Sequence, residues 1–233
     1  MKKNTAIILI LLGLALIPVT CTFLFSGDEE DDSPSFASSV LSPGTGAVPV
    51  FRGFENRRYQ QYDALIAKYV ADYNANRAKW AGATVEQAAA MPELTTAQVK
   101  AHMIQETGGG DVRSRAAWAK DPLQVNVPGD WNPYKKYLGL REPRKRNEGS
   151  LEKNLKAGIM LLARKGYGVA GQPAANNRKG SFDGWETALQ RYNGRSDKTA
   201  DGRPYRVGYA ERILDRARRG EKEEVEIPIK TKK

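Results

Sequence analysis

Residues 95–110 read TTAQVKAHMIQETGGG and carry the signals for both ends of a helix. The first four, Thr95-Thr-Ala-Gln98, form a capping box, in which the Thr hydroxyl and the Gln side chain satisfy exposed amides at a helix start. The glycines at 108–110 end the helical propensity. The segment therefore predicts a helix whose last turn includes Glu106.

One face of that expected helix combines apolar residues with an acid. Val99, Met103 and Glu106 follow one another at i, i+4 and i+7, which places them on the same side. Burial disfavours an ionised carboxylate, and so does the negative C-terminal end of the helix dipole. We therefore expect a raised pKa for Glu106, which is what a general acid needs near neutral pH.

Helical patterns also occur on both sides of this segment. Thr84-Val-Glu-Gln87 is a second capping box, and Asp183-Gly-Trp-Glu186 is a third. Tyrosine and apolar residues spaced by three and four predict one long amphipathic helix from Glu55 to about Trp80, with the tyrosines in packing roles. Because no repeat and no convincing set of alternating strands occurs, we predict a mainly α domain over residues 55–220. Further helices are expected at residues 150–165, 183–192 and 205–219.

The first residues of the chain predict a membrane address. Lys2 and Lys3 precede an apolar run at residues 6–25, which is long enough to span a bilayer as a helix. We assign residues 1–27 to a signal or anchor segment, and an uncleaved anchor is favoured over cleavage or lipidation at Cys21. By the positive-inside rule the two lysines stay in the cytoplasm, so the rest of the chain is expected on the periplasmic or cell-surface side.

Two further segments flank the predicted domain. Residues 28–54 combine an acidic run with Ser, Pro and Gly, and they have too few apolar positions for a core element. They predict a flexible tether that lets the domain reach away from the membrane. Residues 221–233 form a charged C-terminal tail, for which both an edge strand and a loose tail stay open.

The cysteine and histidine content argues against several kinds of chemistry. The only cysteine is Cys21 and the only histidine is His102. The chain therefore cannot form an intramolecular disulfide, and it is a poor candidate for a zinc hydrolase, a His-dependent triad or a Cys/His amidase. We expect neither a metal nor a cofactor, and we expect His102 to be a packed or surface residue rather than a catalyst.

Five short segments between Val99 and Leu214 follow one another in a recognisable order. They are Ile104-Gln105-Glu106-Thr107, Pro122-Leu123-Gln124-Val125, Ala157-Gly158-Ile159-Met160-Leu161-Leu162, Ala188-Leu189-Gln190-Arg191-Tyr192-Asn193-Gly194 and Tyr209-Ala-Glu-Arg-Ile-Leu214. This order resembles the lysozyme-like superfamily, in particular the family of soluble lytic transglycosylases and goose-type lysozymes. Thr107 stands where that family has Ser, and Asp121-Pro122 stands where it has Ala-x-Gly.

The resemblance implies a lysozyme-like helical domain with a catalytic cleft. In that fold Glu106 would be the catalytic acid, and Gln124 would lie in the cleft near it. Tyr192 and Asn193 would help to hold Glu106 and the N-acetyl group of the sugar. We therefore predict Glu106 as the catalytic residue and the other three as substrate-binding residues.

The reaction that the resemblance implies is cleavage of the β-1,4 bond between N-acetylmuramic acid (MurNAc) and N-acetylglucosamine (GlcNAc) in peptidoglycan. A lytic transglycosylase needs only Glu106 and leaves 1,6-anhydro-MurNAc ends, and we favour this interpretation. A muramidase needs a second carboxylate to position water, for which Asp111, Asp121 and Asp130 are candidates, although each is also explained as a turn residue. A non-catalytic peptidoglycan-binding or scaffold protein is the third interpretation.

The expected partners follow from the charge and from export. The formal net charge of +10 suits a polyanion without choosing one. Export argues against nucleic acid, and the basic residues are not interleaved with stacking aromatics. The resemblance implies contact with peptidoglycan glycan strands, and the N-terminal segment predicts contact with a membrane. An envelope-spanning machine is a further candidate partner.

Overall fold

The computed structural model describes residues 54, 57–110, 113–167 and 180–220. The chain divides into two units, residues 1–46 and 47–233, and every described residue belongs to the second. The predicted anchor segment 1–27, residues 28–53 of the predicted tether and the tail 221–233 lie outside the described residues. No helix in the described ranges is long and apolar enough to cross a membrane.

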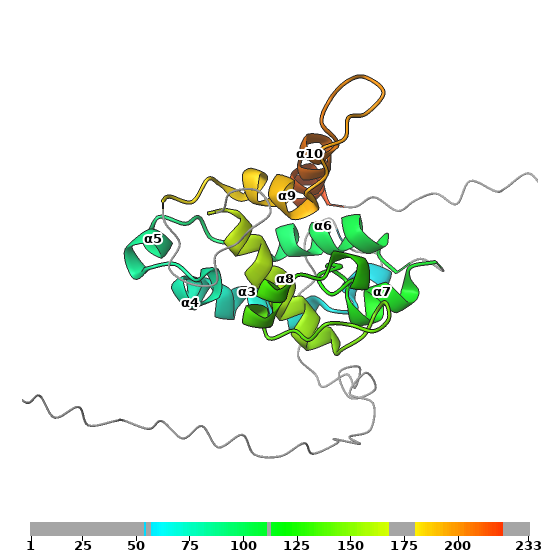
Figure 1. Cartoon of the computed structure of the whole chain (residues 1–233), viewed down its shortest axis with the longest axis horizontal. Helices are drawn as coiled ribbons and strands as arrows, with labels where there is room; N and C mark the ends of the chain where they lie inside the picture. Colours follow the sequence, from blue (N-terminus) through cyan, green and yellow to red (C-terminus); the bar gives the residue numbers. More distant parts are fainter. Residues whose placement is uncertain (1–53, 55–56, 111–112, 168–179, 221–233) are drawn as a thin grey trace, which may run out of the picture. The chain divides into compact units, whose positions relative to one another are not determined.

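The described residues are mainly helical, which confirms the predicted mainly α class (Figure 1). Within these ranges the only β feature is an isolated antiparallel bridge between Lys198 and Pro204. The α-helices are α2 (Arg57–Gln60), α3 (Asp63–Ala75), α4 (Arg77–Ala81), α5 (Val85–Ala89), α6 (Thr96–Thr107), α7 (Arg115–Lys120), α8 (Leu151–Lys165), α9 (Trp185–Asn193) and α10 (Tyr205–Arg219), and the 3-10 helices are η1 (Pro128–Asp130) and η2 (Pro133–Leu138).

The predicted single helix from Glu55 to Trp80 is wrong, because α2, α3 and α4 are separate helices. The second break is at Asn76, whose backbone lies outside the helical region at φ −126° and ψ 34°. Its side-chain amide donates to the carbonyl of Asp72 at 3.1 Å and to the carboxylate of Asp72 at 2.8 Å. An Asn side chain that bonds to nearby backbone competes with continued helix, which is why α3 ends here.

The tyrosines of this region lie in the core, as predicted. Tyr59 and Tyr73 are almost fully buried, and Tyr73 meets Trp80 of α4 edge-on with ring centroids 5.9 Å apart. Phe54 is fully buried in the same cluster, although the predicted tether extended through this position. The folded part of the chain therefore includes Phe54.

Helix starts follow the sequence signals in two cases of three. Thr84 and Thr95 both form complete capping boxes, with Gln87 and Gln98 as the reciprocal partners. The third predicted box is wrong, because α9 begins after Gly184 and has no side-chain cap. Asp183 lies one residue too early to cap α9, and its carboxylate instead pairs with Arg191 at 2.7 Å.

Helix α8 runs through the middle of the described helices and packs against α3, α4, α7, α9 and η2 (Figure 1). Leu155, Ile159 and Leu162 on its buried face join the main core. A smaller cluster of Val125, Leu138, Leu140, Ala157 and Leu161 attaches the 121–127 turn and η2 to the same helix. The turn that follows α7 is thereby held against a long, well-packed helix.

Helix α6 is held between α3 on one side and α10 on another. Its Lys100 is fully buried and bonds to the carboxylate of Asp63 and to the carbonyl of Tyr59. On another side, α6 packs against α10, which also packs against α9 (Figure 1). Buried ion pairs hold their partners in one geometry, because separating them leaves a buried charge uncompensated.

Candidate active site

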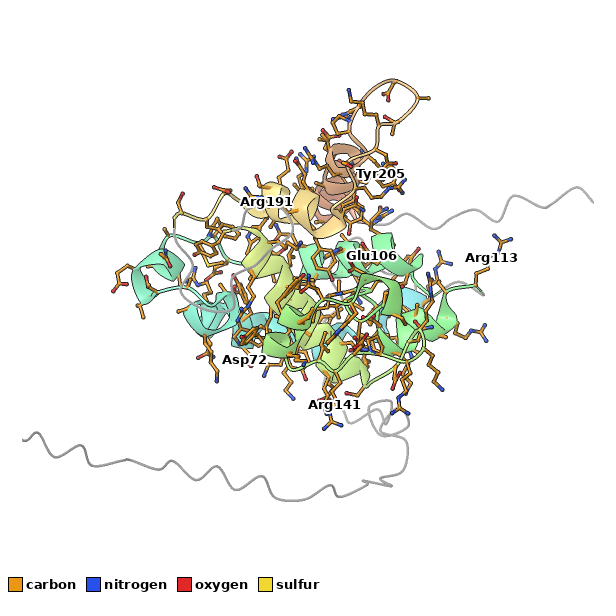
Figure 2. All side chains as sticks on the ribbon, viewed as in Figure 1. Asp72, Glu106, Arg113, Arg141, Arg191 and Tyr205 are labelled. Carbon is orange, nitrogen blue, oxygen red and sulfur yellow. The ribbon has the colours of Figure 1, made fainter. Side chains whose placement is uncertain are left out.

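Glu106 lies in the last turn of α6, on the face predicted from the sequence. Val99 and Met103 on that face are fully buried, whereas the Glu106 side chain keeps 18% of its surface exposed. Figure 2 shows Glu106 on α6, the helix against which α10 packs. The carboxyl group is thus enclosed on most sides and still reaches solvent.

The glycines after α6 permit an unusually close approach of neighbouring rings. Gly108 ends the helix in the left-handed conformation at φ 57°, and its N–H bonds to the carbonyl of Ile104 at 2.8 Å. At Gly109 an added Cβ would come 2.1 Å from the Tyr59 ring, and at Gly110 it would come 2.8 Å from Trp118. A side chain at either position would therefore collide with a neighbouring ring, and the left-handed backbone of both glycines also disfavours any other residue.

Two aromatic groups link Glu106 to its surroundings. The hydroxyl of Tyr209, from α10, donates to Oε1 of Glu106. On its other side the same hydroxyl oxygen lies 2.8 Å from Nε2 of His102, which precedes Glu106 by one helical turn. From the sequence, Tyr209 is only the first residue of the last of the five resembling segments, and nothing there predicts its contact with Glu106. His102 is fully buried, which confirms that it is packed.

Burial raises the pKa of Glu106 to about 7, from an ordinary value of 4.5. The hydrogen bond from Tyr209 acts in the opposite direction, because it stabilises the carboxylate, and the negative charge of Asp121 raises the pKa further. The predicted rise is confirmed. A carboxyl group with this pKa can both give and accept a proton near neutral pH.

Asp121 has the role of a turn residue. It is fully buried, and its two oxygens accept the backbone N–H groups of Val125 at 3.0 Å and Asn126 at 2.8 Å. Burial raises the pKa of Asp121, and these two hydrogen bonds and the positive charge of Lys135 offset only part of the rise. The carboxylate therefore closes the turn after α7, as the turn interpretation of this residue predicted.

The other two candidates for a second carboxylate differ from Asp121. Asp130 is 79% exposed and pairs with Lys135 at 3.0 Å. Asp111 lies outside the described residues. Among the described candidates, both acids thus have partners that account for their positions.

The structure brings Tyr192 close to Glu106. Its hydroxyl donates to the carbonyl of Leu123 at 2.7 Å, and its ring meets His102 edge-on with centroids 4.5 Å apart. Burial raises the pKa of Tyr192 well above its ordinary value, and the negative charges of Glu106 and Asp121 add to this rise. Tyr192 therefore joins α9, α6 and the 121–127 turn at one point.

Gln124 and Asn193 make local contacts. Gln124 is half-buried with a left-handed backbone at φ 50°, and its amide donates to the carbonyl of Asp121 at 2.7 Å. The side-chain oxygen of Asn193, at the end of α9, accepts the N–H of Arg195 at 3.3 Å. Gln124 therefore lies in the turn whose Leu123 carbonyl accepts the Tyr192 hydroxyl, and Asn193 is the last residue of α9. Their substrate-binding roles stay predictions.

A separate pocket opens at the other end of α6, where α9 and α10 approach it. Its volume is about 960 Å³, and its lining includes Thr95, Gln98, Glu186 and Asp215. Glu106, at the C-terminal end of α6, does not line this pocket. The pocket and the Glu106 carboxyl group are therefore distinct places.

No protein-family model, curated protein or solved structure matches this chain. In residues 54, 57–110, 113–167 and 180–220, no three His, Cys, Asp or Glu side chains gather so that they could hold a metal ion. The chemistry of the site therefore has to be inferred from Glu106 and the groups around it.

Proposed function

We propose that this chain is an exported, membrane-anchored peptidoglycan lytic transglycosylase with a lysozyme-like fold, in which Glu106 is the single catalytic carboxyl group. The observation that carries the proposal is the state of Glu106. It is a partly exposed carboxyl group, held by Tyr209, whose pKa is raised by burial to about 7. The substrate is assigned from the ordered motifs that resemble those of soluble lytic transglycosylases.

In the first step the protonated Glu106 donates its proton to the glycosidic oxygen between MurNAc and GlcNAc. The bond from C1 of MurNAc to that oxygen breaks, and the leaving GlcNAc keeps the proton as a 4-hydroxyl group. Positive charge develops on the MurNAc ring, as in other glycosidase reactions. The resulting Glu106 carboxylate lies beside this charge.

In the second step the Glu106 carboxylate accepts the proton of the MurNAc 6-hydroxyl group. O6 then forms a bond to C1 and gives the 1,6-anhydro end, so no water is consumed. Glu106 is protonated again and ready for another cycle. Because one group acts first as acid and then as base, a pKa near the working pH suits both steps.

The two described candidates for a second carboxylate favour this reaction over hydrolysis. A muramidase needs a second carboxylate that can position water. Both oxygens of Asp121 accept backbone N–H groups, and Asp130 is largely exposed beside Lys135. A reaction that needs only Glu106 therefore fits the described residues better.

The test is to incubate the full chain with purified sacculi and to identify the released muropeptides by mass spectrometry. We expect 1,6-anhydro-MurNAc products from the wild type and from the matched control Asp130→Asn, and none from Glu106→Gln. Equal release by Glu106→Gln would sink the proposal. Products with a reducing end that carries ¹⁸O from labelled water would show that the protein is a muramidase instead. Sacculus binding without any soluble product would show that it is a wall-binding protein.

A further inference from the structure

His102, Tyr209 and Glu106 form a chain of hydrogen bonds between α6 and α10. Nε2 of His102 lies 2.8 Å from the Tyr209 hydroxyl oxygen, and that hydroxyl lies against Oε1 of Glu106. The other ring nitrogen of His102, Nδ1, is buried and has no hydrogen-bond partner among the described residues. This series of hydrogen bonds therefore ends at a solvent-accessible carboxyl group on one side and at an unpaired ring nitrogen on the other.

The tautomer of His102 decides the direction of the hydrogen bonds. A neutral imidazole carries one N–H, and the Tyr209 hydroxyl carries one proton. If the His102 proton is on Nε2, that N–H donates to the Tyr209 oxygen, and the Tyr209 proton is left to donate to Glu106. If the proton is on Nδ1, a buried N–H has no acceptor, and Nε2 competes with Glu106 for the Tyr209 proton. The first arrangement satisfies both donors, and the second does not.

His102 is also kept neutral by its surroundings. Burial lowers the pKa of His102 to about 3, so an imidazolium does not form in the pH range where the carboxyl group titrates. The groups that face Glu106 are His102 from its own helix, Tyr209 from α10, Tyr192 from α9 and Asp121 from the turn after α7.

We propose that His102 is a positioning residue, whose Nε2–H fixes the Tyr209 hydroxyl as a donor to Oε1 of Glu106 and so confines the acid proton to Oε2. With Oε1 occupied by the Tyr209 proton, Oε2 is the oxygen left to carry the proton in the acid form. The catalytic consequence rests on the proposed function, whereas the tautomer and the direction of the hydrogen bonds do not.

The first test reads the tautomer directly and needs no activity. Because His102 is the only histidine in the chain, ¹⁵N-labelled imidazole gives one set of resonances in two-bond ¹H–¹⁵N spectra. We expect a neutral Nε2–H imidazole from roughly pH 5 to 9, since its pKa lies well below that range. An Nδ1–H tautomer, or an imidazole that titrates within the range, would overturn the proposal.

The second test uses two replacements of the same side chain. His102→Gln places an amide N–H near the position of Nε2, and His102→Phe keeps a ring against Tyr192 but has no donor. We expect His102→Phe to lower kcat about 10-fold at unchanged KM, a loss typical of an impaired proton transfer. The basic limb of the profile of kcat against pH should move up by roughly half a pH unit. The reason is that the hydrogen bond from Tyr209, which stabilises the Glu106 carboxylate, becomes weaker.

His102→Gln separates positioning from packing. A restored pH profile in His102→Gln supports the proposal, and the same shift in both variants contradicts it. If the wild type releases no muropeptides at all, the proposed function fails while the NMR experiment still decides the tautomer. If the wild type is active and the NMR shows the Nδ1–H form, the proposed function stands and the positioning role of His102 fails.

Discussion

Glu106 and Asp121 are two carboxyl groups that influence each other electrostatically, yet the chain holds them in opposite ways. Asp121 is fully buried, and two backbone N–H groups donate to it. Glu106 keeps 18% of its side chain exposed, and its hydrogen-bond donor is the hydroxyl of Tyr209. Two backbone donors tie the enclosed Asp121 carboxyl group to its turn, whereas Glu106 has one side-chain donor and still reaches solvent, with which it can exchange a proton. Burial alone does not distinguish an acid that holds a turn from one that can exchange a proton with solvent.

The largest expected effect is on activity. Glu106→Gln removes the acid and leaves a similar shape, so we expect muropeptide release to fall by about 10²–10⁴-fold, the usual contribution of a general acid. Release is measured by mass spectrometry with the full chain. Comparable release by the variant and the wild type would show that Glu106 is not the proton donor.

The next effect is on stability as a function of pH. The pKa of Glu106 is about 7 in the folded chain and 4.5 ordinarily, so the unfolded chain releases this proton first. The contribution of Glu106 to the free energy of unfolding is fully present below its ordinary pKa, and it is lost as the pH rises through its pKa in the folded chain. We expect the free energy of unfolding of the wild type, relative to Glu106→Gln, to fall by about 3 kcal/mol across this interval.

Urea denaturation at several pH values checks that expectation. Glu106→Gln serves as the reference because it cannot ionise at this position, while the pH response of the other groups is retained. A constant difference in the free energy of unfolding between the two proteins across the interval would contradict the raised pKa.

Asp121→Asn tests most directly whether the two carboxyl groups have different roles. An amide accepts through one oxygen only, so one of the N–H groups of Val125 and Asn126 loses its partner at a cost of about 1–3 kcal/mol. Loss of the negative charge also removes one cause of the raised pKa of Glu106, and the basic limb of the pH profile should move to lower pH. Asp197→Asn, in an ion pair with Arg195 that is exposed on both sides, is the matched control. A variant that keeps the wild-type stability would show that Asp121 does not hold the turn.

The smallest expected effect comes from Tyr209→Phe, which removes the hydrogen bond to Glu106 and keeps the ring. We expect kcat to fall about 10-fold. The basic limb should move to higher pH, because that bond holds the pKa of Glu106 down. Tyr205→Phe on the same helix provides the control. If both variants give the same pH profile, Tyr209 has no particular link to the acid.

Local signals predicted several parts of the fold well. The capping boxes at Thr84 and Thr95 formed with their expected Gln partners, because these hydrogen bonds join residues three apart. The break at Asn76 was missed, since helical periodicity continues across it. The box at Asp183 was wrong because a partner in the next turns, Arg191, takes its carboxylate.

The candidate site also combines features that the local sequence predicts with a contact that it does not predict. The apolar face of α6 and the glycines after it were sufficient to predict a shielded Glu106 with a raised pKa, and both follow from residues 95–110. Tyr209 lies 103 residues beyond Glu106 in the chain, and no helical period connects them.

The sequence by itself determined the helical class, the end of α6 and the burial of the side of that helix that carries Glu106. Those features depend on hydrogen bonds and side-chain spacing within one or two turns. Only the tertiary structure decided that Tyr209 donates to Glu106 and that Asp121 belongs to the backbone of its turn. The number and direction of donors around a carboxyl group depend on how α6, α9, α10 and the 121–127 turn pack together, and packing between distant segments has no local signature.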